Sequence, residues 1–382
     1  MARKPQPREP EQVADGNNVG GGIYQNRGAP MFVGDGMQVH LTDQRSGHVS
    51  RRAVLIGLGS VALTSAGGWA GYLILGSEEV GKPAKGTAAK APSDRDVLTG
   101  HTGAVNAVAF SPNGRTLASA GADGTIRFWD LSSRVTTGTL TGHGADVTSV
   151  AFSPDWKTLA SASADGTIRL WDLARGVTRT VLADHTGPVN SVAFSPDSGS
   201  LASGSTDRTT RLWRTASGKC TEVLRKSPAT VNFVMFGPDG SKLLAAYADN
   251  TVGFWDTANT GDGPSVLTVN DISSVNSLAI SAPVIAVGAT PGIVRLWNGD
   301  KSVGPLLETD SPVNALAYHR DGRRLAVGTS SGTVLLWDTK TYKILGSPFT
   351  GHTGAVTSVA FSPDSKVLAS GSEDHSVRLW TV

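Results

Sequence analysis

Tryptophan recurs in this sequence at an almost constant spacing. Seven of the nine tryptophans are separated by 42, 42, 42, 42, 40 and 43 residues, and they stand at Trp129, Trp171, Trp213, Trp255, Trp297, Trp337 and Trp380. Self-similarity at a period of this size means that one small structural unit is copied along the chain. The sequence therefore predicts seven copies of one unit rather than a fold without repeats.

Each copy contains four short apolar segments that are separated by turn residues. In the second copy, residues 147–152 and 159–163 are separated by Ser-Pro-Asp, and Asp-Gly precedes residues 167–171. A more polar run follows at 178–182. Short β-branched runs that are bounded by Pro, Asp and Gly predict strands. A sheet of four short strands cannot bury its faces alone, so we expect neighbouring copies to stack.

The copies share further residues beside the tryptophan. A Gly-His or Asp-His pair opens four of them, and in these copies the tryptophan follows the histidine by 28 residues. Over about residues 94–382 this pattern resembles the WD-repeat β-propeller family. The resemblance implies an all-β, seven-bladed WD-repeat β-propeller, in which each copy forms one blade.

The two ends of the repeat region predict how the ring closes. The chain stops two residues after Trp380, so the last copy has three strands. Residues 94–99 match the segment that precedes the second copy. We expect Val97 and Leu98 to pair with the strand that holds Trp380 and to complete the seventh blade, because closed propellers leave only short, protected edges.

Four polar residues keep a fixed spacing in the complete copies. The resemblance implies that they form a buried hydrogen-bond chain inside each blade, since a buried indole N–H needs an acceptor. The alternative is a Ser/His/Asp set for nucleophilic catalysis, but four equivalent copies favour a structural role. The sets are His101, Ser119, Asp123 and Trp129; His143, Ser161, Asp165 and Trp171; His185, Ser203, Asp207 and Trp213; and His352, Ser370, Asp374 and Trp380.

The fourth, fifth and sixth copies depart from this pattern. We interpret the change as drift in which apolar packing replaces the polar chain. The alternative is a sector that is specialised for a partner. The serine positions hold Ala245, Val287 and Val327, the aspartate positions hold Asp249, Pro291 and Ser331, and the histidine position of the fourth copy holds Ser227.

Charge and cysteine content exclude several classes of function. Residues 94–382 carry 24 Lys and Arg against 25 Asp and Glu, without a basic stripe, so we expect no nucleic acid partner. Cys220 is the only cysteine, and His40, His48, His319 and His375 have no metal-ligand spacing. The sequence therefore predicts neither a cofactor nor a metal, and no catalytic residues.

The first 93 residues have a different composition. Residues 1–50 are rich in Gly, Pro, Gln, Asn and Arg, and we expect them to be disordered. Ala53 to Leu75 form a run of 23 residues without a charge, which as a helix would span about 34 Å. Residues 51–75 therefore predict a single transmembrane helix or signal anchor, and residues 76–93 predict a flexible linker.

Three other interpretations of this run are a dinucleotide-binding turn, an export signal, and a segment buried in the core of a soluble protein, although the propeller needs no extra helix. Gly57 and Gly59 imitate a dinucleotide-binding fingerprint, but no βαβ domain follows. Ser50-Arg51-Arg52 resembles the twin-arginine export motif, which implies a bacterial host and a signal that is cleaved near Ala91. The arginines that precede the run place the N-terminus inside and the propeller outside the membrane.

A ring of small polar side chains is expected at the start of the innermost strands. It consists of Asn106, Thr148, Asn190, Asn232, Asn276, Asn314 and Thr357. These residues either contact a partner or only satisfy strand ends and channel water. Trp156 is either a further anchor for a partner or a residue that covers a blade edge. We predict a membrane-tethered scaffold or sensor that binds an unknown protein or peptide. The alternative is an extracytoplasmic enzyme that uses the central channel of the propeller.

Overall fold

The structure is a computed structural model, and it describes residues 31–33, 37–39, 59–64, 70–75, 96–224 and 229–382. The chain divides into two compact units, Met1–Lys82 and Pro83–Val382.

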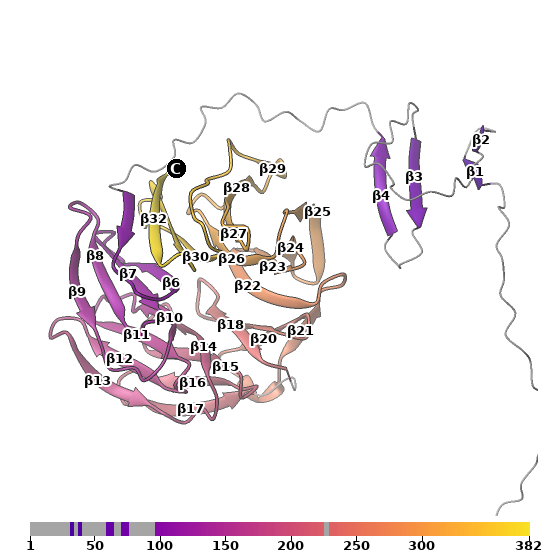
Figure 1. Cartoon of the computed structure of the whole chain (residues 1–382). Helices are drawn as coiled ribbons and strands as arrows, with labels where there is room; N and C mark the ends of the chain where they lie inside the picture. Colours follow the sequence, from indigo (N-terminus) through magenta and orange to yellow (C-terminus); the bar gives the residue numbers. More distant parts are fainter. Residues whose placement is uncertain (1–30, 34–36, 40–58, 65–69, 76–95, 225–228) are drawn as a thin grey trace, which may run out of the picture. The chain divides into compact units, whose positions relative to one another are not determined.

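The second unit contains seven four-stranded antiparallel sheets, the blades, in a closed ring (Figure 1). Consecutive first strands contact one another around the centre, and the strand β6 of blade 1 contacts β30 of blade 7. The last strand of each blade lies at the rim (Figure 1). The predicted all-β, seven-bladed propeller is confirmed.

Blade 1 consists of β6 (Val105–Phe110), β7 (Thr116–Gly121), β8 (Ile126–Asp130) and β9 (Thr136–Leu140), and blade 2 consists of β10 (Val147–Phe152), β11 (Thr158–Ser163), β12 (Ile168–Asp172) and β13 (Val177–Leu182). Blade 3 consists of β14 (Val189–Phe194), β15 (Ser200–Ser205), β16 (Thr210–Arg214) and β17 (Lys219–Leu224). Blade 4 consists of β18 (Val231–Phe236), β19 (Lys242–Tyr247), β20 (Thr251–Asp256) and β21 (Ser265–Thr268). A short 3-10 helix, η2 (Thr260–Asp262), precedes β21.

Blade 5 consists of β22 (Ser274–Ser281), β23 (Val284–Thr290), β24 (Ile293–Asn298) and β25 (Lys301–Glu308). Blade 6 consists of β26 (Val313–Tyr318), β27 (Arg324–Thr329), β28 (Val334–Asp338) and β29 (Lys343–Ile344). Blade 7 consists of β30 (Val356–Phe361), β31 (Val367–Ser372), β32 (Ser376–Thr381) and β5 (Val97–Thr99).

The hydrophobic core lies between the blades. Ala118 and Ile126 of blade 1, for example, pack with Val147, Leu159 and Trp171 of blade 2. All six residues of β11 are buried, whereas β13 at the rim alternates between exposed and half-buried residues up to its last residue, the buried Leu182. The second strand of a blade is therefore covered on both faces, which explains why it is built from small residues such as Ala and Ser.

Strand β5 closes the ring as the two chain ends predicted. It pairs with β32 through Val97↔Arg378, Leu98↔Val377 and Thr99↔Ser376. Leu98 is buried, and it belongs to a cluster that contains residues of blade 7 and of blade 1. The predicted clasp is confirmed.

The first unit differs from the prediction of a single apolar helix over residues 53–75. Its described residues form two antiparallel pairs, β1 (Met31–Val33) with β2 (Met37–Val39), and β3 (Gly59–Thr64) with β4 (Ala70–Leu75). The described part of the chain contains no helix with the length and apolar content of a membrane span. The physical reason is that an apolar run without clear periodicity suits two strands as well as one helix, and Gly67-Gly68 between them is a turn signal.

The remaining predictions for the N-terminal region fall on residues that the structure does not describe. They are the disorder of residues 1–50 apart from β1 and β2, and the linker over residues 76–93. The position of Ser227 also lies outside the described residues.

Candidate functional site

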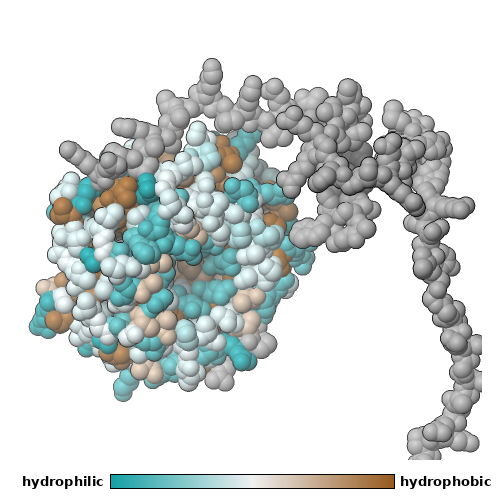
Figure 2. Space-filling model, viewed as in Figure 1, coloured by the Kyte–Doolittle hydropathy of each residue, from teal (hydrophilic) through white to brown (hydrophobic). Residues whose placement is uncertain are grey.

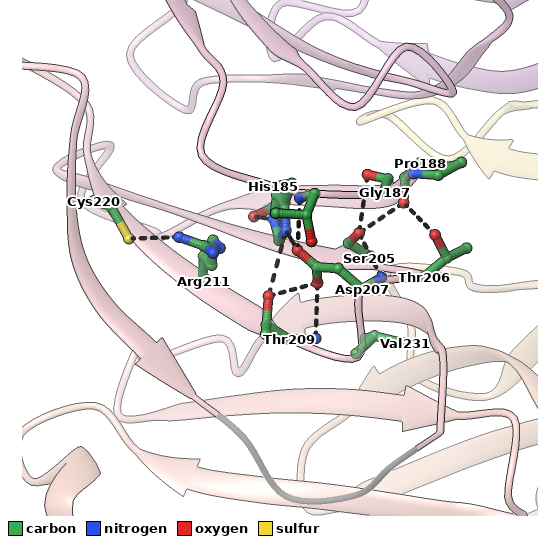
Figure 3. Close-up of polar contacts among 12 residues, drawn as sticks. His185, Gly187, Pro188, Ser205, Thr206, Asp207, Thr209, Arg211, Cys220 and Val231 are labelled. Carbon is green, nitrogen blue, oxygen red and sulfur yellow. Dashed lines mark hydrogen bonds and ion pairs between the residues drawn. The ribbon is translucent and has the colours of Figure 1, made fainter.

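The four polar residues of blade 3 form one hydrogen-bonded chain. Trp213 Nε1–H donates to Ser203 Oγ at 2.8 Å, and Ser203 Oγ lies 2.7 Å from His185 Nε2. His185 Nδ1 lies 2.7 Å from Asp207 Oδ2, and Figure 3 shows both side chains beside Thr209. Three further blades hold the same chain with distances from 2.7 to 3.0 Å, through His101, Ser119, Asp123 and Trp129; His143, Ser161, Asp165 and Trp171; and His352, Ser370, Asp374 and Trp380.

Donor and acceptor chemistry determines the histidine tautomer in these chains. An indole can only donate and an ionised carboxylate can only accept, so Ser203 Oγ accepts from Trp213, and His185 carries a proton on Nδ1 that it donates to Asp207. In the neutral imidazole Nε2 is then an acceptor, and the Ser203 hydroxyl donates to it. In agreement, burial lowers the pKa of His185, although its hydrogen bond to Asp207 acts in the opposite direction.

The aspartate anchors this chain to a turn. Asp207 Oδ1 accepts from the backbone N–H and the hydroxyl of Thr209 at 2.9 and 2.6 Å, and Oδ2 accepts from Thr186 N–H at 3.1 Å. Burial alone would raise the pKa of this carboxyl, but the hydrogen bonds from Thr209 and His185 lower it to about 2. The carboxylate therefore stays charged and holds together two loops of the blade.

Although the geometry is that of a nucleophile, a base and an orienting carboxylate, these sets cannot attack a substrate. Ser119, Ser161, Ser203 and Ser370 are all 0% exposed. Each serine oxygen is also occupied by the indole N–H of its own blade. A nucleophile must reach the reacting atom, so these residues act in the architecture of the blade.

Blades 5 and 6 lack this chain and retain its tryptophan. Trp297 Nε1 and Trp337 Nε1 are buried, and neither has a hydrogen-bond partner among the described residues. The serine positions hold Val287 and Val327, which lie in the apolar clusters of these blades. In blade 4, Ala245 is likewise buried, and Asp249 accepts from the Thr251 hydroxyl. Apolar packing has thus replaced the serine, at the cost of two unsatisfied indole donors.

The small polar residues at the start of the inner strands meet around the centre of the ring. Each lies at an irregularity in the pairing of the first two strands, as between Val105 and Ala107 in blade 1. Such a bulge re-aims a side chain. Asn106 Nδ2–H, for example, donates to the carbonyl oxygen of Val147 in the next blade at 3.0 Å. The equivalent donors are Thr148 to Val189, Asn190 to Val231, Asn232 to Val275, Asn276 to Val313, Asn314 to Val356 and Thr357 to Val105.

These seven bonds connect every blade to the next and return to the first. They show that the ring has a structural role, since each side chain satisfies a strand end of its neighbour. They also orient the residues around one central pocket of about 300 Å³, which all seven line. We call these seven residues together the polar ring. Figure 2 shows a hollow at the centre of the propeller.

The central pocket has no titratable group in its lining. Besides the polar ring, it is lined by Ser, Ala, Val, Leu and one phenylalanine. General acid–base catalysis needs a positioned group such as His, Asp, Glu or Lys. The alternative of an enzyme that works in the channel therefore has no candidate acid or base among the residues of this pocket.

Trp156 does not join the polar ring. It lies in the turn between β10 and β11, at the opposite end of β10 from Thr148. Its ring packs against Phe152 with centroids 4.9 Å apart, and it lines a groove with Phe128 and Leu173. Its φ of 62° is the left-handed region, which is unusual for a bulky residue. The same turn has a glycine or serine with positive φ in blades 1, 3, 4, 6 and 7, at Gly114, Ser198, Gly240, Gly322 and Ser365.

Sequence reasoning missed a second tier of residues in the pocket. The hydroxyls of Ser149, Ser191, Ser277 and Ser358 each accept a backbone N–H from the next blade, at 3.1 to 3.3 Å. In blade 4 the equivalent position holds Phe233, which is half-buried and also lines the pocket. Each of these residues directly follows a member of the polar ring, so comparison of the aligned copies could have identified them.

Comparison with known proteins places the repeats in one family. The profile described as "WD domain, G-beta repeat" matches residues 93–130, 134–172, 176–214, 218–256, 302–338 and 343–381. Most of blade 5 lies outside these segments.

Several relatives share segments of this repeat region. The chain is 31% identical over 123 residues to Protein ROOT INITIATION DEFECTIVE 3 of Arabidopsis thaliana, which covers 31% of this chain and 27% of that protein. It is 38% identical over 102 residues to WD repeat-containing protein 1 of Gallus gallus. The matched segment is 26% of this chain and 17% of that protein. It is 46% identical over 66 residues to Pre-mRNA-processing factor 19 homolog 2 of Arabidopsis thaliana. The matched segment is 17% of this chain and 12% of that protein.

The matched segments thus span 27% or less of the length of these relatives. All three relatives are eukaryotic, and they give no support to the bacterial origin that the twin-arginine resemblance implied. The six segments that match the family profile cover more than half of the residues of this chain. The chain therefore belongs to the WD domain, G-beta repeat family.

Proposed function

We propose that this protein is a scaffold or sensor whose propeller binds another protein or a peptide, and that it has no catalytic activity of its own. The observation that carries the proposal is the polar ring around the central pocket. Convergent polar groups at the mouth of a pocket are typical of binding sites, in which they fix the orientation of a ligand. The pocket also lacks any titratable side chain, which favours recognition over chemistry.

The partner is expected on the face of the propeller that carries the polar ring. This can be tested with a photo-crosslinking amino acid at Thr186, an exposed residue in the loop before β14. Ala216 is the matched control, because it is exposed in the turn after β16, at the opposite end of the same blade. Capture from cells with the full chain should give a crosslinked partner at Thr186 and none at Ala216. A partner that crosslinks only at Ala216 would refute this face, and no protein or peptide at either position would refute the binding function.

We also propose that residues 53–75 attach the chain to a membrane, with the propeller on the outer side. The support is the run of 23 uncharged residues that directly follows Arg51 and Arg52. The full chain should remain in the membrane fraction after alkaline carbonate extraction, and protease added to intact cells should release the propeller. Release by carbonate, or protection of the propeller until lysis, would contradict the proposal.

The twin-arginine alternative has its own signature. It predicts a protein that is found free outside the cell and begins after Ala91. Substitution of Arg51 and Arg52 by lysine should abolish that export, whereas a membrane anchor should insert almost unchanged.

A further inference from the structure

We propose that the mouth of the central pocket binds a positively charged N–H group of a peptide, the ammonium of a lysine or the guanidinium of an arginine, beside Asn232, Phe233 and Asn276. The inference rests on the proposed function and specifies the chemistry of its partner. This ligand is inferred because some hydrogen-bonding atoms of the polar ring already bond to other residues of the protein, whereas others remain free.

The amide donors of Asn232 and Asn276 are fully used inside the protein. Asn232 Nδ2 donates to Val275 O at 2.8 Å and to Ser274 Oγ at 3.1 Å. Asn276 Nδ2 donates to Val313 O at 2.9 Å and to Thr290 Oγ1 at 3.1 Å. Each amide has two N–H donors, so no donor is left for a ligand.

The amide oxygens of these two residues are free for a ligand. Among the described residues, no hydrogen bond reaches Oδ1 of Asn232 or Asn276, and neither atom belongs to the buried polar atoms without a partner. The orientation of the amides follows from chemistry, because the carbonyls of Val275 and Val313 can only accept and must face Nδ2. Both residues line the central pocket, and their amides present only acceptors to it.

Phe233 adds an aromatic surface to the same pocket. It directly follows Asn232, and the bulge between Val231 and Phe233 interrupts the usual alternation of side chains. The positions equivalent to Phe233 in the other blades hold only Ala or Ser, so the phenylalanine is particular to this sector. The face of an aromatic ring attracts a cation.

The lining of the pocket carries no charge of either sign, because it contains no Lys, Arg, His, Asp or Glu. No positive group therefore repels an incoming cation, and the attraction comes from the amide oxygens and the aromatic ring rather than from a carboxylate. Amide oxygens can replace the hydration shell of a cation, as rings of carbonyl oxygens do in ion channels. An anion would find no donor at Asn232 or Asn276. A volume of about 300 Å³ admits one side chain rather than a folded segment.

The probes are three fluorescent octapeptides in which glycine alternates with lysine, with arginine, or with acetyl-lysine. Binding to the full chain is measured by fluorescence anisotropy at physiological and at high salt. We expect the lysine or the arginine peptide to bind, and the acetylated peptide to bind at least about tenfold more weakly, because hydrogen bonds to charged groups are stronger than neutral ones.

Asn-to-Thr substitutions separate ligand binding from the integrity of the ring. Threonine already occupies two positions of the polar ring, where its hydroxyl makes the bond to the next blade. Asn232→Thr with Asn276→Thr should therefore keep the fold, remove both amide oxygens and weaken binding about tenfold or more. Phe233→Leu should also weaken it, since leucine keeps the apolar packing without an aromatic face. Asn113→Thr, on an exposed residue in the turn between β6 and β7 that does not line the pocket, is the control, and it should leave the affinity unchanged.

Two outcomes would overturn the inference. They are equal binding of the acetylated peptide and unchanged binding by the folded Asn232→Thr, Asn276→Thr variant. The proposed function fails separately, when no protein or peptide crosslinks to the propeller. A partner that crosslinks at Thr186 and binds equally well after acetylation of its amines and substitution of its arginines would leave the function intact and refute only this inference.

Discussion

At the scale of single residues, buried polar groups in this propeller are satisfied in series. The hydroxyl of Ser203 joins an indole that can only donate to an imidazole that is held neutral. Removal of one member leaves its neighbours buried and unpaired, which costs more than the bond itself contributes. The four complete chains therefore concentrate stability in a few side chains.

We predict that Asp207→Ala lowers the free energy of unfolding by about 1–3 kcal/mol, because it removes the acceptor of His185, Thr186 and Thr209. Urea denaturation followed by tryptophan fluorescence measures this loss. Ser331→Ala is the control at the aligned position of blade 6, which is exposed, and it should cost less than about 0.5 kcal/mol. Equal midpoints for the two variants would show that the chain does not stabilise the blade.

Stability should fall as the pH is lowered below the usual pKa of histidine. Burial lowers the pKa of His101, His143, His185 and His352 in the folded protein. Below pH 6.5 the unfolded chain therefore binds protons that the folded chain does not, which favours unfolding. The aspartates affect stability only at lower pH, because their pKa values in the folded protein are lowered from the usual 3.8 to about 2. Their contribution to the free energy of unfolding is lost as the pH falls below 3.8 and they become protonated.

Urea midpoints at about pH 7.5 and about pH 5.5 test this expectation. The wild type should be less stable at the lower pH. In His185→Gln the difference between the two midpoints should be smaller, because one of the four histidines no longer titrates. An unchanged difference would contradict the role of these histidines.

At the scale of single elements, the turns between strands depend on left-handed backbone that glycine adopts without strain. Gly332, between β27 and β28, has φ of 80°, and a Cβ there would lie 2.9 Å from the carbonyl oxygens of His352 and Gly354. Gly299, between β24 and β25, has φ of 64° and open space around its Cβ position. The two positions separate backbone strain from steric overlap.

Gly299→Ala should cost about 1–2 kcal/mol, from the left-handed conformation alone. Gly332→Ala should cost clearly more, because the methyl group meets two backbone atoms of the neighbouring blade that cannot move independently. Thermal unfolding of the two variants measures the difference. If both lose the same stability, the contact between this turn and blade 7 is looser than the structure indicates.

At the scale of the whole molecule, the ring depends on one three-residue strand. Leu98 of β5 is 2% exposed and packs in a cluster with Val105 of blade 1 and Val377 of blade 7. Leu98→Ala should therefore destabilise the propeller by about 2–4 kcal/mol. Thr99→Ala, on an exposed neighbour in the same strand, should have little effect.

The unfolding curve of Leu98→Ala also tests cooperativity. A single transition at a lower midpoint is expected, since blades 1 and 7 are joined through the polar ring as well as through β5. A separate early transition would mean that blade 7 opens while the other blades stay folded.

The sequence by itself determined the parts of this protein that repeat. The spacing of the tryptophans predicted seven blades, and the three-stranded last copy predicted the pairing of β5 with β32. Both predictions succeeded because every copy packs in the same way and shares one sequence pattern. A residue that departs from the pattern in one copy can therefore be recognised by comparison with the other six. The run over residues 53–75 occurs once, and an apolar composition without periodicity could not separate one helix from two strands.

Only the tertiary structure decided what the polar ring does. The sequence shows seven small polar residues, but the direction of their hydrogen bonds depends on the next blade, about 40 residues away along the chain. The fold uses the amide donors of Asn232 and Asn276 for these contacts and leaves their oxygens in the pocket. It also brings Phe233 beside them through a bulge. Which atoms of a side chain remain free is a property of its partners in space, and no pattern of residue types contains it.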